Sequence, residues 1–102
     1  MTAEPDAARI AAAVLAVPGV AGLHGGRFGE IATLVPPQRV AGVRVRDGDV
    51  TIAVTARYPL VATELAAAVR SAAGDTGREV HVVVADIVEP PITHEQLKEK
   101  VS

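Results

Sequence analysis

The 102-residue chain has no cysteine and no tryptophan, and its aromatic residues are Phe28 and Tyr58. Without cysteine there is no disulfide, thiolate metal site or cysteine nucleophile, which fits a reducing compartment. Two aromatic side chains offer little surface on which to stack a base, a sugar or a flavin. Alanine and valine dominate the composition, so we expect a core of small and β-branched side chains.

Long apolar runs and an excess of one charge are also missing. No stretch reaches the roughly 20 apolar residues that span a bilayer, because charged residues or prolines interrupt each one. Residues 1–6 are acidic where a signal peptide is basic, so we expect no export signal. The formal net charge of −2 favours neither nucleic acid nor an anionic membrane as a partner. These features predict a cytoplasmic protein without a direct membrane span.

Nucleophiles and paired carboxylates form no recognisable catalytic arrangement. The serines are Ser71 and Ser102, and neither stands in the G-x-S-x-G pattern of a hydrolase. Asp47 and Asp49 flank Gly48, where aspartate favours a turn. We therefore expect no enzyme, no catalytic residues and no cofactor.

The three histidines, His24, His81 and His94, stand in separate predicted elements. None has a second histidine or a carboxylate at the spacing of a metal site, and His94-Glu95 matches only the start of H-E-x-x-H. We expect no metal site and interpret His81 as a hydrogen-bonded histidine of a strand. An enzyme that uses His24 or His81 as a base stays open as an alternative.

Hydrophobic periodicity predicts two helices and several strands. The first helix covers residues 6–17 and ends at Pro18-Gly19. Residues 20–34 form two short extended pieces joined by a glycine-rich turn at 24–27, and Pro36-Pro37 enforces an extended connection. The second helix starts with Pro59 near its first position and ends at Gly74. Its expected apolar stripe consists of Val61, Leu65, Ala68, Val69 and Ala72.

Asp47-Gly48-Asp49 predicts an antiparallel hairpin between strands at 43–46 and 50–57. Apolar residues alternate with threonine, alanine and arginine over 50–57, which is typical of a half-buried strand. Residues 79–88 are apolar on both faces, which is typical of an interior strand. The strand, helix and strand over 50–88 suggest a crossover with parallel strands.

These elements predict a small α+β domain over residues 1–89, with two main helices packed on a mixed β-sheet. A tail over residues 90–102 follows. Thr93 and Gln96 have the spacing of a capping box, so a short C-terminal helix is expected from Thr93. We expect Leu97 and Val101 to dock on the domain or on a partner.

The glycine-rich stretch at residues 18–34 and a set of arginines are the candidate interaction surfaces. The glycines match neither a phosphate loop nor a dinucleotide fingerprint, so turn formation is the preferred interpretation. Gly25, Gly26, Arg27 and Phe28 are its candidate contact residues. The arginines could share one face of the hairpin and form an anion-binding patch, a surface for an acidic protein partner or a self-association surface, with a solvated strand face as the preferred interpretation. They are Arg44, Arg46 and Arg57, with Arg39 a further candidate.

Several short motifs occur in an ordered series: VPGVAGL at 17–23, GGRFGEI at 25–31, GVRV at 42–45, Tyr58-Pro59, and VHV at 80–82. In this order, over about residues 10–88, the chain resembles the alkaline shock protein family (Asp/Gls family), whose members are also described as envelope-stress-response proteins. The resemblance implies a non-enzymatic bacterial protein of envelope homeostasis that self-associates. It also implies a cytoplasmic location near the inner face of the cell membrane, through a small membrane anchor protein or a family paralogue. A small anion- or ligand-binding module that uses the arginine-lined hairpin is the alternative.

Overall fold

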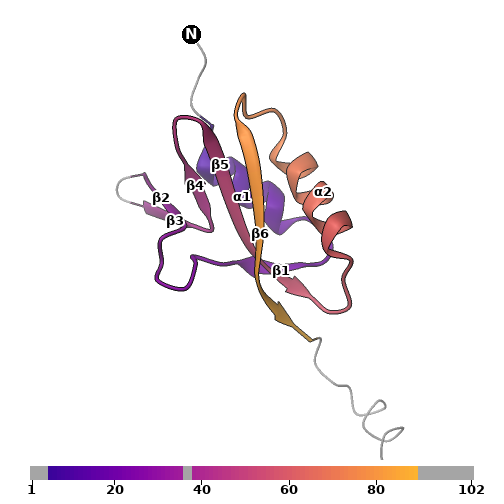
Figure 1. Ribbon diagram of the computed structural model, residues 1–102. Helices are drawn as coiled ribbons and strands as arrows, with labels where there is room; N and C mark the ends of the chain where they lie inside the picture. The colour runs from indigo at the N-terminus through magenta and orange to yellow at the C-terminus, as the bar shows by residue number, and fades with distance from the viewer. Residues whose placement is uncertain (1–4, 36–37, 90–102) are drawn as a thin grey trace, which may run out of the picture.

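The computed structural model describes residues 5–35 and 38–89 (Figure 1). Within these ranges the chain has an α+β fold, as predicted, with two helices and strands in a mixed sheet and a separate ribbon. The elements are α1 (Ala7–Leu15), β1 (Val20–Leu23), β2 (Ala32–Val35), β3 (Gln38–Ala41), β4 (Val43–Val45), β5 (Asp49–Arg57), α2 (Ala62–Ala73) and β6 (Glu79–Val88). The expected C-terminal helix, with Leu97 and Val101, lies outside the described residues.

Strand β5 is the central strand of the main sheet. Along one edge it pairs antiparallel first with β4 and, farther on, with β1. Along the other edge it pairs in parallel with β6 over its whole length. The predicted hairpin between β4 and β5 and the predicted parallel pair of β5 and β6 are therefore confirmed.

Both helices pack against this sheet around one core. In Figure 1, α1 lies behind the strands and α2 stands beside β6. Helix α1 begins where the side chain of Asp6 accepts a hydrogen bond from the backbone N–H of Arg9, 3.1 Å away. The core lies between the helices and the sheet, and its largest fully buried side chains are Ile10, Val14, Val43, Val50, Ile52, Val54 and Val69. All of them are β-branched residues, as the composition predicts.

Helix α2 differs from its prediction at its start and along its buried face. It begins at Ala62, after Val61 at the N-cap, so Pro59 precedes the helix and does not begin it. Val61 and Ala68 are exposed, and the buried residues are Leu65, Val69 and Ala73. The predicted stripe was wrong at Val61 because this residue precedes the first helical turn. It was wrong at Ala68 because the buried residues follow one another at a spacing of four positions, which leaves Ala68 off the buried face. Its end at Gly74 is confirmed, where the backbone N–H bonds the carbonyls of Arg70 and Ser71.

Strands β2 and β3 form a separate antiparallel ribbon that the sequence did not predict. One hydroxyl attaches this ribbon to β4. The Oγ1 of Thr33 donates to the carbonyl oxygen of Val43 at 2.7 Å and accepts from the backbone N–H of Val45 at 3.2 Å. A single side chain thus satisfies two backbone groups on the outer edge of β4.

The predicted burial of the two long strands was wrong. Thr51 and Ala53 of β5 are buried, so both faces of its middle are covered and it is the interior strand. Strand β6, expected inside the sheet, is an edge strand on which Glu79, His81 and Val83 are exposed. The side chains of Thr51 and Ala53 are small enough to be buried on the second face of β5. In β6, the many valines suggested an interior strand, although polar residues alternate with them at Glu79 and His81. Within the described ranges, no helix is long and apolar enough to span a membrane.

Candidate functional site

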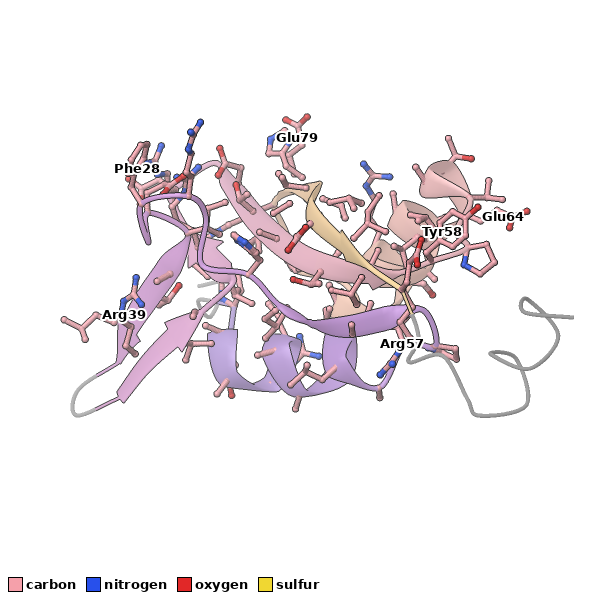
Figure 2. The ribbon with its side chains drawn as sticks, turned by 90° about the horizontal axis from the view of Figure 1, so that it is seen from below. Phe28, Arg39, Arg57, Tyr58, Glu64 and Glu79 are labelled. Carbon is pink, nitrogen blue, oxygen red and sulfur yellow. The ribbon has the colours of Figure 1, made fainter. Side chains whose placement is uncertain are left out.

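A loop at residues 24–31, which follows β1, lies on the face of the sheet opposite α1 (Figure 2). Its first residue is fixed to the central strand, because the backbone N–H of His24 donates to the carbonyl oxygen of Ala53 at 2.9 Å. The backbone N–H of Ile31 donates to the carbonyl oxygen of Gly25 at 2.9 Å and closes the loop. Gly26 has a φ of 85°, in the region that favours glycine. The predicted role in turn formation is confirmed for Gly26.

Two side chains hold the loop in place, one from the loop itself and one from the β2–β3 ribbon. The Nδ1 of His24 accepts a hydrogen bond from the backbone N–H of Gly26 at 3.0 Å. The guanidinium of Arg39, on β3, donates to the carbonyl oxygen of Gly29. The loop is therefore fixed at both ends of its turn.

Glu30 fixes the tip of the loop. Its carboxylate accepts a hydrogen bond from the backbone N–H of Phe28 at 2.8 Å. Hydrogen bonds from the backbone N–H of Glu30 itself and from that of Phe28 lower the pKa of the Glu30 carboxyl below its ordinary value of 4.5. The carboxylate is ionised at neutral pH and supports the loop in this form.

Phe28 projects from the tip, as Figure 2 shows, and its side chain is 86% exposed. The guanidinium carbon of Arg27 lies 5.9 Å from the centre of its ring, within the range of a cation–π contact. An aromatic ring and a cation are therefore presented together on a loop whose backbone is held in place. Aromatic and arginine side chains are the residues that most often dominate protein–protein binding energy.

A hollow of about 620 Å³ lies between this loop and β6. The loop supplies mostly polar walls and β6 supplies an apolar floor; the lining residues are His24, Gly26, Arg27, Glu30, Ile31, Val83 and Ala85. Because the Nδ1 of His24 accepts a hydrogen bond, the ring's N–H is on Nε2, which is a donor. The hollow thus combines a cation, an N–H donor, the Glu30 carboxylate and an apolar surface.

The structure does not gather the arginines of the hairpin into one patch. Arg44, on β4, is partly buried: its Nε is enclosed without a hydrogen-bond partner among the described residues, and its Nη2 lies 3.5 Å from the Oγ1 of Thr51. Arg57 lies six positions beyond Thr51 on β5, about 20 Å at the usual rise of a strand. In the view of Figure 2, Arg39 lies at one end of the molecule and Arg57 lies well away from it, toward the other end.

Arg46 follows β4 at the hairpin turn, where it is exposed. Its carbonyl oxygen accepts a hydrogen bond from the Nη1 of Arg78, 2.8 Å away. This contact joins the hairpin turn to the segment that leads into β6. Arg46 is not among the residues that line the hollow.

Sequence reasoning found Gly25, Gly26, Arg27 and Phe28, which the structure brings together in the loop. It missed the contribution of β6, whose Val83 and Ala85 form the floor of the hollow. The alternation of Glu79 and His81 with valines was the available signal, because polar residues at every second position indicate an exposed strand face.

Comparison with protein-family models, with curated proteins and with solved structures finds no match to this chain. The resemblance found in the sequence motifs therefore stays a prediction. Within the described residues there is also no group of three or more histidine and carboxylate side chains that could hold a metal ion. The function has to be argued from the loop, the hollow and the strand beside them.

Proposed function

We propose that this chain is a non-enzymatic interaction protein of the alkaline-shock type, which serves bacterial envelope homeostasis by binding protein partners and by self-association. The observation that supports the proposal is Phe28, 86% exposed at the tip of a loop that hydrogen bonds hold in place. The partners are a second copy of the chain and a small membrane anchor protein or family paralogue. The chain then lies at the inner face of the cell membrane through its partner.

The energetics favour binding at this position. Burial of a phenylalanine side chain contributes about 1.5–3 kcal/mol. A loop that already holds its bound shape loses little conformational entropy on association. Arg27, stacked near the ring, can pair with a carboxylate of the partner at the rim of the contact. A partner with an apolar pocket bordered by acidic residues fits this tip.

The experiment is cell fractionation combined with cross-linking capture of neighbours in a bacterium that carries the chain. The wild type is expected in the envelope fraction together with an envelope protein. Phe28→Ala, which keeps the backbone bond to Glu30, should reduce the captured partner about tenfold, the effect of losing about 1.4 kcal/mol. Leu34→Ala, at another exposed apolar residue, is the matched control and should retain the partner. A wild-type protein that diffuses freely, without self-association or envelope partner, contradicts the proposal.

The hollow supports a second candidate, a module that binds a small anion. The placement of the arginines moves this alternative from the hairpin face to Arg27 and His24, which line the hollow above the apolar floor. A volume of about 620 Å³ suits a small molecule. Thermal-shift measurements with a panel of carboxylates and phosphates test it. Stabilisation by one class that Arg27→Ala abolishes and Arg57→Ala retains supports the candidate, whereas no shift with any of them rejects it.

A further inference from the structure

The outer edge of β6 is the edge that faces away from β5. In the described part of the chain, β6 pairs with β5 alone. Figure 1 shows β6 as the last strand of the sheet, with α2 beside it. An edge of this length exposes backbone donors and acceptors in a row, which is a template for another strand.

Hydrogen bonds identify the residues that form this edge. The backbone N–H of Glu79 donates to the carbonyl oxygen of Gly48, and beyond a bulge at Ala85 the carbonyl oxygen of Val88 accepts from Tyr58. Both bonds point toward β5. Alternate residues of a strand direct their backbone groups to opposite edges, and the bulge reverses the alternation. Val80, Val82 and Val84 therefore direct their N–H and C=O groups outward.

The first of these residues is already engaged. The Nε of Arg70, on α2, donates to the carbonyl oxygen of Val80 at 3.2 Å. Val82 and Val84 have no strand beside them in the residues that the structure describes. The free part of the outer edge is thus centred on Val83, whose side chain is 39% exposed.

The composition of this edge does not discourage pairing. Residues 80–85 (VHVVVA) contain no lysine, proline or glycine, and the carboxylates of Glu79 and Asp86 stand outside them. Natural edge strands commonly carry lysine, other charged side chains or proline to prevent association. A valine-rich edge without them is suited to pair with another strand of the same character.

We infer that this edge pairs antiparallel with the same edge of a second copy of the chain, with Val83 opposite its counterpart and Val82 opposite Val84. The inference rests on the self-association in the proposed function and names the surface that performs it. In this register each pair of Val82 and Val84 exchanges both backbone hydrogen bonds, and the two Val83 side chains meet in the closer, non-bonded pair between them. The bond between Arg70 and Val80 is retained. No two like charges face each other across the pair.

Helix α2 leaves room for this arrangement. Arg70 reaches the outer edge, so the residues three and four positions before it, Ala67 and Ala66, lie on the same side of the helix. Both side chains are single methyl groups, and Ala67 is exposed. Two α2 helices can therefore approach each other beside the joined sheets without a steric obstacle from these positions.

The test is the mass of the full chain in solution, measured by sedimentation velocity over a range of concentrations. The wild type is expected to form a dimer. Val83→Lys and Val83→Glu each place two like charges opposite each other and should raise the dimer dissociation constant at least about tenfold. An equal mixture of the two variants should restore the dimer. Leu34→Lys, at an exposed residue of the ribbon, is the control and should leave the dimer unchanged.

Amide hydrogen exchange tests the register. The N–H groups of Val82 and Val84 should exchange slowly in the wild-type dimer and rapidly in Val83→Lys, whose thermal unfolding checks that it is folded. A wild type that stays monomeric, or a Val83→Lys protein that dimerises like the wild type, overturns the inference. Phe28→Ala separates the two proposals, because this variant should lose the envelope partner and keep the dimer. A wild-type chain that is monomeric but still captures its envelope partner refutes only the pairing of β6.

Discussion

The guanidinium of Arg9 donates a hydrogen bond of 3.1 Å from its Nη2 to the carbonyl oxygen of Ala73. These residues are 64 positions apart in the chain, one near the start of α1 and the other at the end of α2. The last carbonyls of a helix lack partners within it and carry partial negative charge. Arg9 therefore caps α2 and joins the two helices over the core.

Replacement of Arg9 by alanine should lower the free energy of unfolding by about 1 kcal/mol, because one hydrogen bond to a cation is lost at a partly exposed position. Urea denaturation measures this change. Arg57→Ala, at an exposed arginine for which no side-chain hydrogen bond is seen in the described residues, serves as the control and should change stability by less than about 0.5 kcal/mol. Equal effects in the two variants would contradict the capping role.

Thr33→Val should destabilise the protein by about 1–2 kcal/mol. The substitution keeps the shape of the side chain but removes the hydroxyl, so the carbonyl of Val43 and the N–H of Val45 lose a partner. Thr33→Ser retains the hydroxyl and should restore most of the loss. Chemical denaturation compares the three proteins, and a valine variant as stable as the wild type would show that water replaces this contact without cost.

Gly42→Ala should be among the more damaging single substitutions. Gly42 has a φ of 88°, and a Cβ there would stand 2.6 Å from the Cβ of Leu23 and 3.1 Å from the carbonyl oxygen of Ala53. Left-handed strain and overpacking together cost about 2–4 kcal/mol. Gly48→Ala is the matched control, because nothing lies within 4 Å of its added Cβ. Thermal unfolding should show a large loss for Gly42→Ala and almost none for Gly48→Ala; similar losses would disprove the packing argument.

The lowered pKa of Glu30 gives the loop a dependence on pH. Backbone hydrogen bonds from Glu30 itself and from Phe28 stabilise the carboxylate, so its folded pKa lies below the ordinary 4.5. The stability that it contributes is present in full above 4.5 and is lost as the pH falls through the folded value. Glu30→Gln should therefore unfold at a lower temperature than the wild type at pH 7. The difference should shrink in acid, and a difference that grows there would reverse the assignment.

Local signals identified most of the elements. Apolar residues at helical spacing predicted α1, and Asp-Gly between alternating strands predicted the β4–β5 hairpin. The run of β-branched residues predicted β6. These features depend on residues that are neighbours in the sequence, so periodicity and turn chemistry suffice to recognise them. In the loop, the same kind of signal identified Gly25 to Phe28.

Long-range contacts decided the remainder. A strand rich in valine is compatible with the middle or the edge of a sheet. Among the strands that the structure describes, β6 pairs with β5 alone, which makes it an edge strand. In the sequence, Thr51 and Ala53 indicate an exposed strand face. In the structure they are buried, because Arg44 lies beside Thr51 and the 24–31 loop is bonded to Ala53. The hollow exists only because that loop stands beside Val83, more than 50 positions away in the chain.

The sequence by itself therefore determined the α+β class, the order of the main elements and the glycine-rich loop. These follow from short-range backbone preferences and from the periodicity of hydrophobic residues. Tertiary structure alone decided which strand is central, where Phe28 is presented and which backbone groups of β6 face away from β5. Burial and exposure are properties of the packed chain, since they depend on which distant segments remove a side chain from water.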